Sequence, residues 1–205
     1  MSSRDAILAR VKKAISGAMA APVPRSYRTA GSSADRVELF CERVGDYRAD
    51  VRRVAPGDEA AEIAAVCESL GARRLVVPAG LPAELRPEAL ELVEDDQLDP
   101  HELDAMDGVV TGCSVAIAET GTIVLTAAPS EGRRAITLVP DLHICLVEES
   151  QIVELVPEAV ARLADAVRQR RPLTFISGPS ATSDIELSRV EGVHGPRTLV
   201  VLVVG

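Results

Sequence analysis

A glutamate between two apolar runs is the first group in the sequence that could do chemistry. Residues 116–125 read Ala-Ile-Ala-Glu-Thr-Gly-Thr-Ile-Val-Leu. Glu119 could accept a hydrogen bond from a ligand hydroxyl or act as a base, with Thr120, Gly121 and Thr122 lining the ligand. The same pattern fits a tight turn, in which Gly121 supplies a positive φ and the two hydroxyls satisfy local backbone groups. Both interpretations stay open on the sequence alone.

A second segment, residues 177–186, comes directly after an apolar run and carries several hydroxyls. Ser183 and Glu186 fit a capping box, which predicts a helix that begins at Asp184. The amino terminus of such a helix favours anions, although the Asp184 carboxylate would repel them. The candidate ligand-binding residues of this segment are Gly178, Ser180, Thr182 and Asp184.

A histidine and an arginine pair complete the candidate groups. His194 lies in Gly-Val-His-Gly-Pro, where it could transfer protons or simply be hydrogen-bonded within a constrained turn. Arg133 and Arg134 could clamp a carboxylate or phosphate, or be solvated. We expect these groups to meet Glu119 and Ser180 at one edge of a sheet, with the arginines on a covering loop. Glu119 and His194 are the candidate catalytic residues of this site.

The elements that would position these groups alternate between strands and helices. Several strands are apolar on both faces, which is typical of a mostly parallel sheet covered on both sides. The sequence therefore predicts a three-layer α/β fold. Strands are expected at 50–55, 75–77, 91–94, 114–118, 122–127, 136–139, 143–148, 173–177 and 198–204, and helices at 58–70, 82–90 and 157–170, the last with Val160, Leu163, Ala164 and Val167 inward.

Charge divides the chain into two parts. Residues 1–57 carry 11 basic and 6 acidic side chains, and residues 58–205 carry 11 and 25, so the net charges are +5 and −14. We expect a helical arm at residues 1–56 and an α/β domain at 57–205. The arm is predicted to hold two amphipathic helices, whose apolar faces need cover from the acidic body or a partner. Their apolar residues are Ile7, Leu8, Val11, Ile15 and Met19 in the first and Val37, Phe40, Cys41 and Val44 in the second.

Composition excludes several classes of function. The net charge of −9 and the 2% aromatic content argue against a nucleic-acid or anionic-membrane binder. No apolar run is long enough for a membrane helix, and no signal peptide is recognisable, so we expect a soluble cytoplasmic protein. The four cysteines are 26, 46 and 32 residues apart, and the three histidines are scattered, so the sequence predicts no metal and no cofactor in this chain.

Three ordered motifs resemble the LUD domain, and more closely the lactate-utilisation protein C family. They are residues 116–125, Arg-Arg-Ala-Ile-Thr-Leu-Val-Pro-Asp-Leu-His-Ile at 133–144, and the Gly-Pro-Ser-Ala-Thr-Ser-Asp-Ile-Glu and Gly-Val-His-Gly-Pro segments within 178–196. The resemblance implies a fold of the sugar-phosphate isomerase and coenzyme A transferase type. It also implies a part in oxidising L-lactate to pyruvate within a three-protein system whose other members carry the iron–sulfur clusters.

Two functions from different classes stay open. In the first, the chain is a non-redox accessory component that binds its iron–sulfur partners and a small carboxylate or phosphate. In the second, it is a stand-alone enzyme of coenzyme A transferase or isomerase type that uses Glu119. Stable copurification with iron–sulfur proteins favours the first, and turnover by the isolated chain favours the second.

Overall fold

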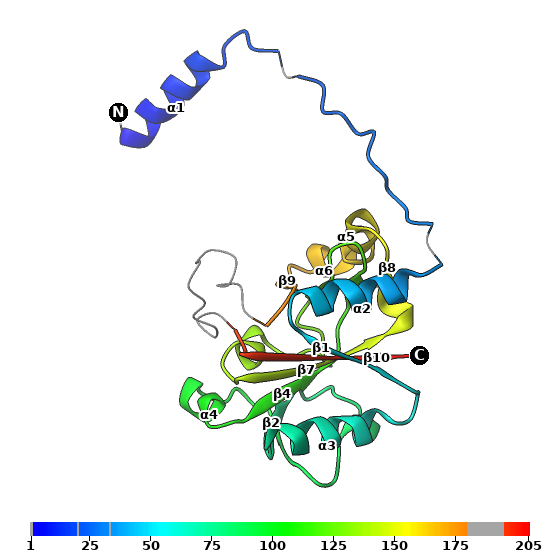
Figure 1. Cartoon of the computed structure of the whole chain (residues 1–205). Coiled ribbons are helices and arrows are strands. Elements are labelled where there is room, and N and C mark those ends of the chain that lie inside the picture. The colour runs from blue at the N-terminus through cyan, green and yellow to red at the C-terminus, as the bar shows by residue number, and fades with distance from the viewer. Residues whose placement is uncertain (1, 20, 33, 180–194) are drawn as a thin grey trace.

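The fold is built on a six-stranded parallel sheet (Figure 1). The computed structural model describes residues 2–19, 21–32, 34–179 and 195–205. In spatial order the strands are β1 (Asp50–Val54), β10 (Thr198–Val204), β7 (Leu142–Glu148), β4 (Gly108–Thr111), β2 (Arg74–Val77) and β3 (Glu91–Glu94). Every described pairing among them is parallel. The expected mostly parallel sheet is therefore confirmed.

A smaller sheet of four short strands packs above the large one. Its order is β8 (Ile152–Val153), β5 (Val115–Ile117), β6 (Thr122–Leu125) and β9 (Thr174–Ile176). Strand β6 pairs antiparallel with both β5 and β9. The sequence predicts β5, β6 and β9 but neither β8 nor the separation into a second sheet, because a short apolar run does not reveal its pairing partner.

The two faces of the large sheet bury different clusters. Along β10, Val200 and Leu202 face α3 (Glu59–Leu70), whereas Leu199 and Val201 face the small sheet and α2 (Arg36–Asp46). Figure 1 shows α3 on one side of the sheet and α2 with the small sheet on the other. The expected three-layer α/β architecture is confirmed, since strands apolar on both faces need cover on both faces.

Short helices fill the remaining borders of the sheets. Helix α4 (Pro100–Asp104) buries Leu103 beside β2 and β4. Helices α5 (Val156–Arg162) and α6 (Ala164–Arg168) come after β8, and their buried side chains Ala159 and Ala166 lie on the inner side. The helix expected at 82–90 is reduced to the single 3₁₀ turn η1 (Ala83–Leu85), and a further turn, η3 (Glu149–Gln151), links β7 to β8.

Two expectations about elements are wrong. Residues 136–139 are not a strand, because the turn η2 (Arg134–Thr137) covers the large sheet there and buries Ile136. The helix expected at 157–170 breaks after Arg162, and its inward face differs from the expected one. Val160 and Val167 are 57% and 56% exposed, whereas Leu163 is buried. The two buried alanines form the inner side because small side chains let the helices approach the small sheet closely.

The first helix, α1 (Ser3–Ala14), lies apart from the sheets at the end of an extended segment (Figure 1). Ser2 caps it and no residue in it is buried. Helix α2, by contrast, buries Phe40 and Val44, and β1 is the edge strand of the large sheet. Residues 36–54 are thus packed into the α/β body, while the division at residue 56 into an arm and a domain stays a prediction.

Candidate functional site

The segment around Glu119 forms the turn between β5 and β6. Gly121 has φ +57°, and its N–H donates to the carbonyl of Ala118 over 3.3 Å. A Cβ on Gly121 would lie 2.6 Å from the carbonyl carbon of Arg43 in α2. The turn therefore needs glycine for two reasons, the positive φ and the contact with the backbone of α2.

A chain of hydroxyls runs from this turn to the end of β9. The hydroxyl of Thr122 lies 2.8 Å from that of Thr120 and 2.8 Å from that of Ser177. Ser177 precedes Gly178, where an added Cβ would lie 3.1 Å from the Cβ of Tyr47. The structure thus brings together Thr120, Thr122 and Ser177, the residue just before the 178–196 motif. Hydroxyls in such a chain can donate to a carboxylate or phosphate oxygen.

Glu119 itself is held by the extended segment that precedes α2. We call residues 21–32 the strap. Arg28 donates to Glu119 Oε1 over 2.5 Å, and the backbone N–H of Ser32 donates to Glu154 Oε2 over 2.7 Å. The side chains of Arg28 and Glu119 are 67% and 46% exposed. Solvent screens a pair this exposed, so the Glu119 carboxylate is covered by the strap but not buried.

The two arginines occupy different positions from those expected for a ligand clamp. Arg133 donates from Nε and Nη2 to the two oxygens of Asp95, over 2.7 and 2.8 Å, and from Nη2 to the carbonyl of Leu98. Asp95 is nearly buried, and its hydrogen bonds raise the pKa of Arg133. Arg133 therefore ties the loop after Pro129 to the end of β3 rather than to the hydroxyl chain, while Arg134 is exposed.

Four of the candidate residues lie outside the described part of the chain: Ser180, Thr182, Asp184 and His194. The helix expected from Asp184 also lies there. The flanking residues do meet, since a Cβ on Gly195 would lie 3.1 Å from the carbonyl oxygen of Pro179. The convergence of these four residues with Glu119 stays a prediction.

A buried carboxylate is a feature that the sequence does not reveal. Glu131 is 1% exposed and accepts hydrogen bonds from the Ser114 hydroxyl and from the backbone N–H groups of Thr126 and Ala128. These donors compensate the carboxylate for its loss of water. The Pro-Ser-Glu-Gly sequence gives no sign of burial, because a glutamate in a turn is usually solvated. Glu131 fixes the loop that carries Arg133.

A second buried polar group lies between β4 and β7. His143 Nε2 lies 2.8 Å from the hydroxyl of Thr111, and His143 Nδ1 has no hydrogen-bond partner. The neighbouring Cys113, together with His143 and Thr111, lowers the pKa of the Cys145 thiol despite its burial. The neighbouring Cys145 and desolvation raise the pKa of the Cys113 thiol. The nearly continuous apolar run of β7 marks His143 only as a core residue.

Neither these residues nor others suggest a metal centre in the described ranges. There, no three histidine, cysteine, aspartate or glutamate side chains are grouped so as to hold a metal ion. Among the same residues, no helix is both long and apolar enough to span a bilayer.

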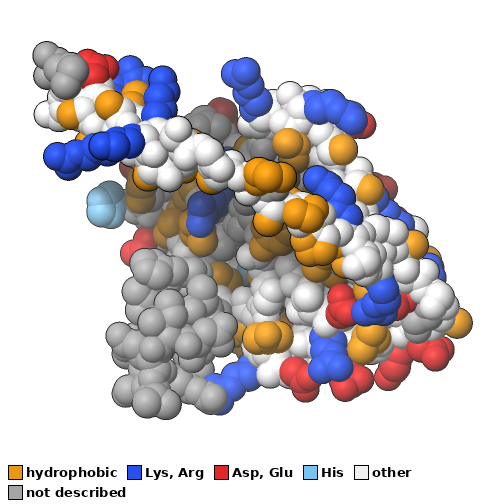
Figure 2. Space-filling view, turned by 90° about the horizontal axis from the view of Figure 1, so that it is seen from above, with side chains coloured by type: hydrophobic (Ala, Val, Ile, Leu, Met, Phe, Trp, Pro, Cys, Tyr) orange, Lys and Arg blue, Asp and Glu red, His pale blue; other side chains and the backbone are white. Residues whose placement is uncertain are grey.

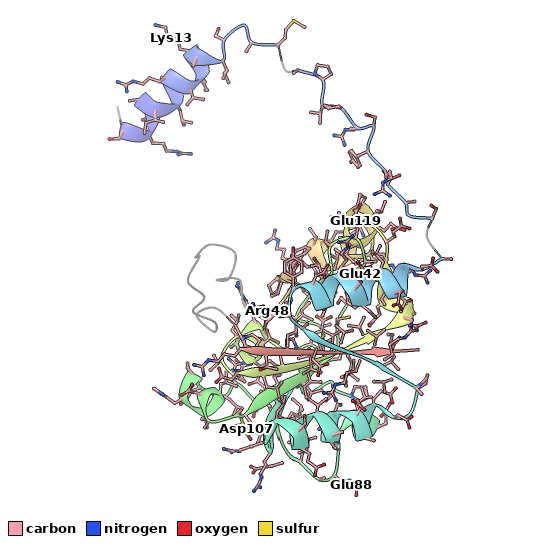
Figure 3. All side chains as sticks on the ribbon, in the orientation of Figure 1. Lys13, Glu42, Arg48, Glu88, Asp107 and Glu119 are labelled. Atoms are coloured by element: carbon pink, nitrogen blue, oxygen red, sulfur yellow. The ribbon has the colours of Figure 1, made fainter. Side chains whose placement is uncertain are left out.

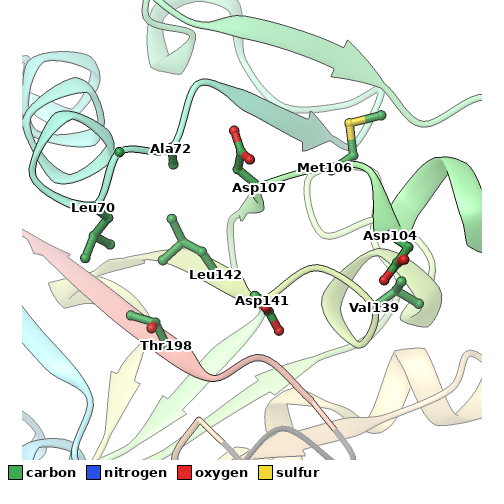
Figure 4. Close-up of a pocket in the computed structure, with 10 residues that line it drawn as sticks. Leu70, Ala72, Asp104, Met106, Asp107, Val139, Asp141, Leu142 and Thr198 are labelled. Atoms are coloured by element: carbon green, nitrogen blue, oxygen red, sulfur yellow. The ribbon is translucent and has the colours of Figure 1, made fainter.

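A cavity of about 400 Å³ lies at the end of the large sheet where its central parallel strands begin (Figure 4). Met106, Leu142 and Thr198 stand at the starts of β4, β7 and β10. Figure 4 shows Asp107 and Asp141 on either side of Leu142 and Asp104 farther along, beside Val139. None of the candidate site residues that the structure describes lines this cavity.

Three comparisons with known proteins place the chain. A family model described as the LUD domain matches residues 84–204, more than half of the chain. Over 203 residues the chain is 48% identical to a lactate utilization protein C of Deinococcus radiodurans, covering 97% of this chain and 94% of the relative. A protein of the same name from Halalkalibacterium halodurans is 28% identical and covers 80% of this chain and 77% of its own length.

A solved structure agrees with the sequence relatives. The crystal structure of a DUF162 family protein from Deinococcus radiodurans superposes with a TM-score of 0.75 at 43% identity, and it covers 85% of this chain and 99% of that chain. Sequence identity of this size along most of the chain indicates a shared fold as well as shared motifs. The chain belongs to the LUD domain family.

Proposed function

We propose that the protein is a non-redox accessory component of a cytoplasmic iron–sulfur system that oxidises L-lactate to pyruvate. The observation that carries this proposal is the 48% identity to a lactate utilization protein C, which extends along 97% of this chain and 94% of the relative. Similarity along both whole lengths supports a shared role better than a matching domain alone.

The distribution of cysteines supports the assignment of the redox centres to partner proteins. Clusters held by one chain need cysteines close together in sequence, and the four here are at least 26 residues apart. Cys67, Cys113 and Cys145 are buried, and Cys41 is partly buried. The contribution of this chain would then be binding, to its partners and to a small anion.

The hydroxyl chain is the anion site we propose. Thr120, Thr122 and Ser177 offer O–H donors beside Gly178, and Arg28 adds a guanidinium next to Glu119. A 2-hydroxy acid presents a carboxylate, which would accept hydrogen bonds from these groups. Its hydroxyl would donate a hydrogen bond to Glu119. Arg134 and the residues Ser180, Thr182, Asp184 and His194 stay candidates for the same site.

Reconstitution tests the accessory role. The chain is mixed with the iron–sulfur proteins encoded beside it, and lactate-dependent reduction of an artificial electron acceptor is measured, with native mass spectrometry for assembly. We expect a stable complex and lactate oxidation that requires this chain. Full oxidation by the partners without this chain would refute the proposal.

Variants test the site separately from the role. Glu119→Gln keeps the shape of the side chain and removes its charge, so folding should be spared while lactate oxidation falls. Glu88→Gln, in an exposed loop far from the hydroxyl chain, is the matched control. If Glu119→Gln and His194→Ala both support full oxidation, the motifs are structural and only the accessory role remains.

A second candidate function rests on the exposure of Glu119. Its side chain is 46% exposed at a glycine-containing turn, where a carboxylate could act as nucleophile or base of a coenzyme A transferase or isomerase. The isolated chain should then exchange coenzyme A between an acyl thioester and a free carboxylate, and Glu119→Gln should abolish this turnover. An inactive isolated chain that completes the lactate system favours the accessory role.

A further inference from the structure

Helix α1 presents an apolar stripe that nothing in the described structure covers. Ile7, Leu8, Val11 and Ile15 recur at helical spacing and are between 45% and 61% exposed. Arg10 and Lys12 flank this stripe on its two sides. Over Ser3–Ala14 the helix carries four basic residues and one acidic residue, a net charge of +3. Figure 2 shows the basic side chains gathered around α1.

The cavity at the start of the parallel strands, which we call the groove, complements α1 because it has an apolar floor and acidic residues around it. Ala72, Met106 and Leu142 form an apolar floor, with Leu70 exposed at its border. Asp104, Asp107 and Asp141 surround the floor (Figure 4). The backbone N–H groups of Arg73 and Arg74 donate to Asp107 and lower its pKa, which keeps it charged.

Two helix ends reinforce the negative potential of this groove. Helix α3 ends at Leu70 with Gly71 in the left-handed conformation, so its last carbonyls lie at the border of the groove. Helix α4 ends at Asp104, also beside it. Carbonyl ends of helices carry partial negative charge and favour cations. A small anion is therefore disfavoured here, and a basic amphipathic segment fits.

We propose that α1 docks into this groove on a second copy of the chain. The apolar stripe would cover Leu70, Met106 and Leu142, while Arg10 and Lys12 approach Asp104 and Asp141. Charge complementarity decides between occupants, because the helix is +3 whereas residues 58–205 carry −14. Thr120, Thr122 and Ser177 do not line the groove, so this proposal does not depend on the lactate function.

The length of the linker favours a second copy over the same chain. The strap is held by Arg28 on Glu119 and by Ser32 on Glu154, and while both contacts are made, residues 15–27, thirteen residues, must reach from Arg28 to α1. They span at most about 45 Å when fully extended. Figure 3 shows Glu119 and Asp107 on opposite sides of the body. A body of about 170 residues is about 40 Å across, so half its circumference, about 60 Å, exceeds that reach.

A zero-length crosslinker tests the docking on the full chain. A carbodiimide joins amines to carboxylates that touch them, and Lys12 and Lys13, both in α1, are the only lysines of the sequence. Equal amounts of ¹⁴N- and ¹⁵N-labelled chain are mixed and crosslinked. We expect a covalent dimer in which Lys12 or Lys13 of one label is joined to Asp104, Asp107 or Asp141 of the other.

Paired variants check the two surfaces. Val11→Asp places a charge in the apolar stripe and should lower the yield of dimer by about tenfold or more, whereas Ala9→Asp makes the same charge change on the opposite side of α1 and should leave it nearly unchanged. Asp104→Arg should lower the yield by about tenfold, and Glu88→Arg, at an exposed position outside the groove, should not; arginine reverses the charge without adding an amine that the carbodiimide could couple.

Several results would overturn the proposal. Crosslinks to the three aspartates within one label only would mean docking in the same chain. Crosslinks from the lysines to other carboxylates, or a chain that sediments as a monomer without crosslinks, would mean that the groove is not the docking site. Binding of α1 to anionic phospholipid vesicles together with a monomeric chain would assign the helix to a membrane surface.

Discussion

Helices α1 and α2 are nearly equal in length, 12 and 11 residues, and each carries apolar side chains at helical spacing. Helix α2 buries Phe40 and Val44 against both sheets, whereas α1 buries nothing. The difference comes from the segment to which each helix is joined. Helix α2 leads within a few residues into β1, while α1 leads into a linker. Amphipathic spacing thus shows that a helix needs a surface, and the neighbouring elements decide which one.

The largest expected effect is the difference between the two helices in how much an apolar side chain contributes to the free energy of unfolding. Phe40→Ala removes a fully buried ring from the cluster between α2 and the sheets, so the free energy of unfolding should fall by about 3–5 kcal/mol. Ile7→Ala on α1 should change it by less than about 0.5 kcal/mol. Urea unfolding at low protein concentration measures both. Equal losses would mean that α1 is packed on the body of its own chain.

A pair of glycines tests the contact between α2 and the β5–β6 turn. Gly121→Ala forces a Cβ onto the backbone of Arg43 at a positive φ, so it should cost about 1–3 kcal/mol of unfolding free energy. Gly17 also has a positive φ, +82°, where alanine is strained, but it lies just after α1 and outside the packed body, so its backbone can relax without unfolding the sheets. Gly17→Ala should therefore leave the unfolding midpoint nearly unchanged, and a midpoint lowered as far as in Gly121→Ala would contradict the comparison.

Loss of the contact between the strap and Glu119 should lower the free energy of unfolding only slightly. It should clearly increase the rate at which a protease cleaves the strap. Arg28→Gln removes an exposed ion pair with Glu119, which contributes less than about 1 kcal/mol. Trypsin should then cleave after Arg25 several times faster, because the strap opens more often. Arg4→Gln, the same charge change on α1, is the control. Unchanged cleavage would show that Ser32 and Glu154 hold the strap without Arg28.

The smallest effect concerns the start of α1. The hydroxyl and N–H of Ser2 donate to the carboxylate of Asp5 and lower its pKa from the ordinary value of an aspartate. A lowered pKa stabilises the folded cap above about pH 4, and this contribution disappears as the pH falls through the lowered value. Amide NMR should show Ser2→Ala fraying the first turn more at neutral pH than in strong acid, where only the hydrogen bond from the Asp5 N–H to the Ser2 hydroxyl is left to lose. A pH-independent difference would rule out the charged cap.

The strands and the large sheet are well predicted because their signal is local. Apolar runs such as 198–204 are read directly, and Gly71 marks the end of α3. Elements near 136 and 163 are wrong or incomplete, because their form depends on what they cover. The apolar pattern of Ile136 fits a strand as well as a 3₁₀ turn, and only the surface beneath it decides between them.

The candidate site is predictable only in part for the same reason. The contact between Thr122 and Ser177 is expected once both motifs are placed at strand ends. The pairing of Arg133 with Asp95 and the burial of Glu131 depend on residues distant in sequence or on loop packing, which residue type does not encode. Neither the strap on Glu119 nor the acidic groove has a motif, since both arise where separate segments meet.

The strand order has a consequence for how the protein is made. Strand β1 is the edge of the large sheet, and its one neighbour there, β10, comes after nearly all the other elements. A ribosome therefore releases β1 and α2 long before the strand that completes their sheet has been synthesised. During that interval the apolar face that will hold Phe40 has no permanent cover, and chaperones or the growing chain must shield it. Folding of this side of the molecule waits for synthesis to pass residue 204.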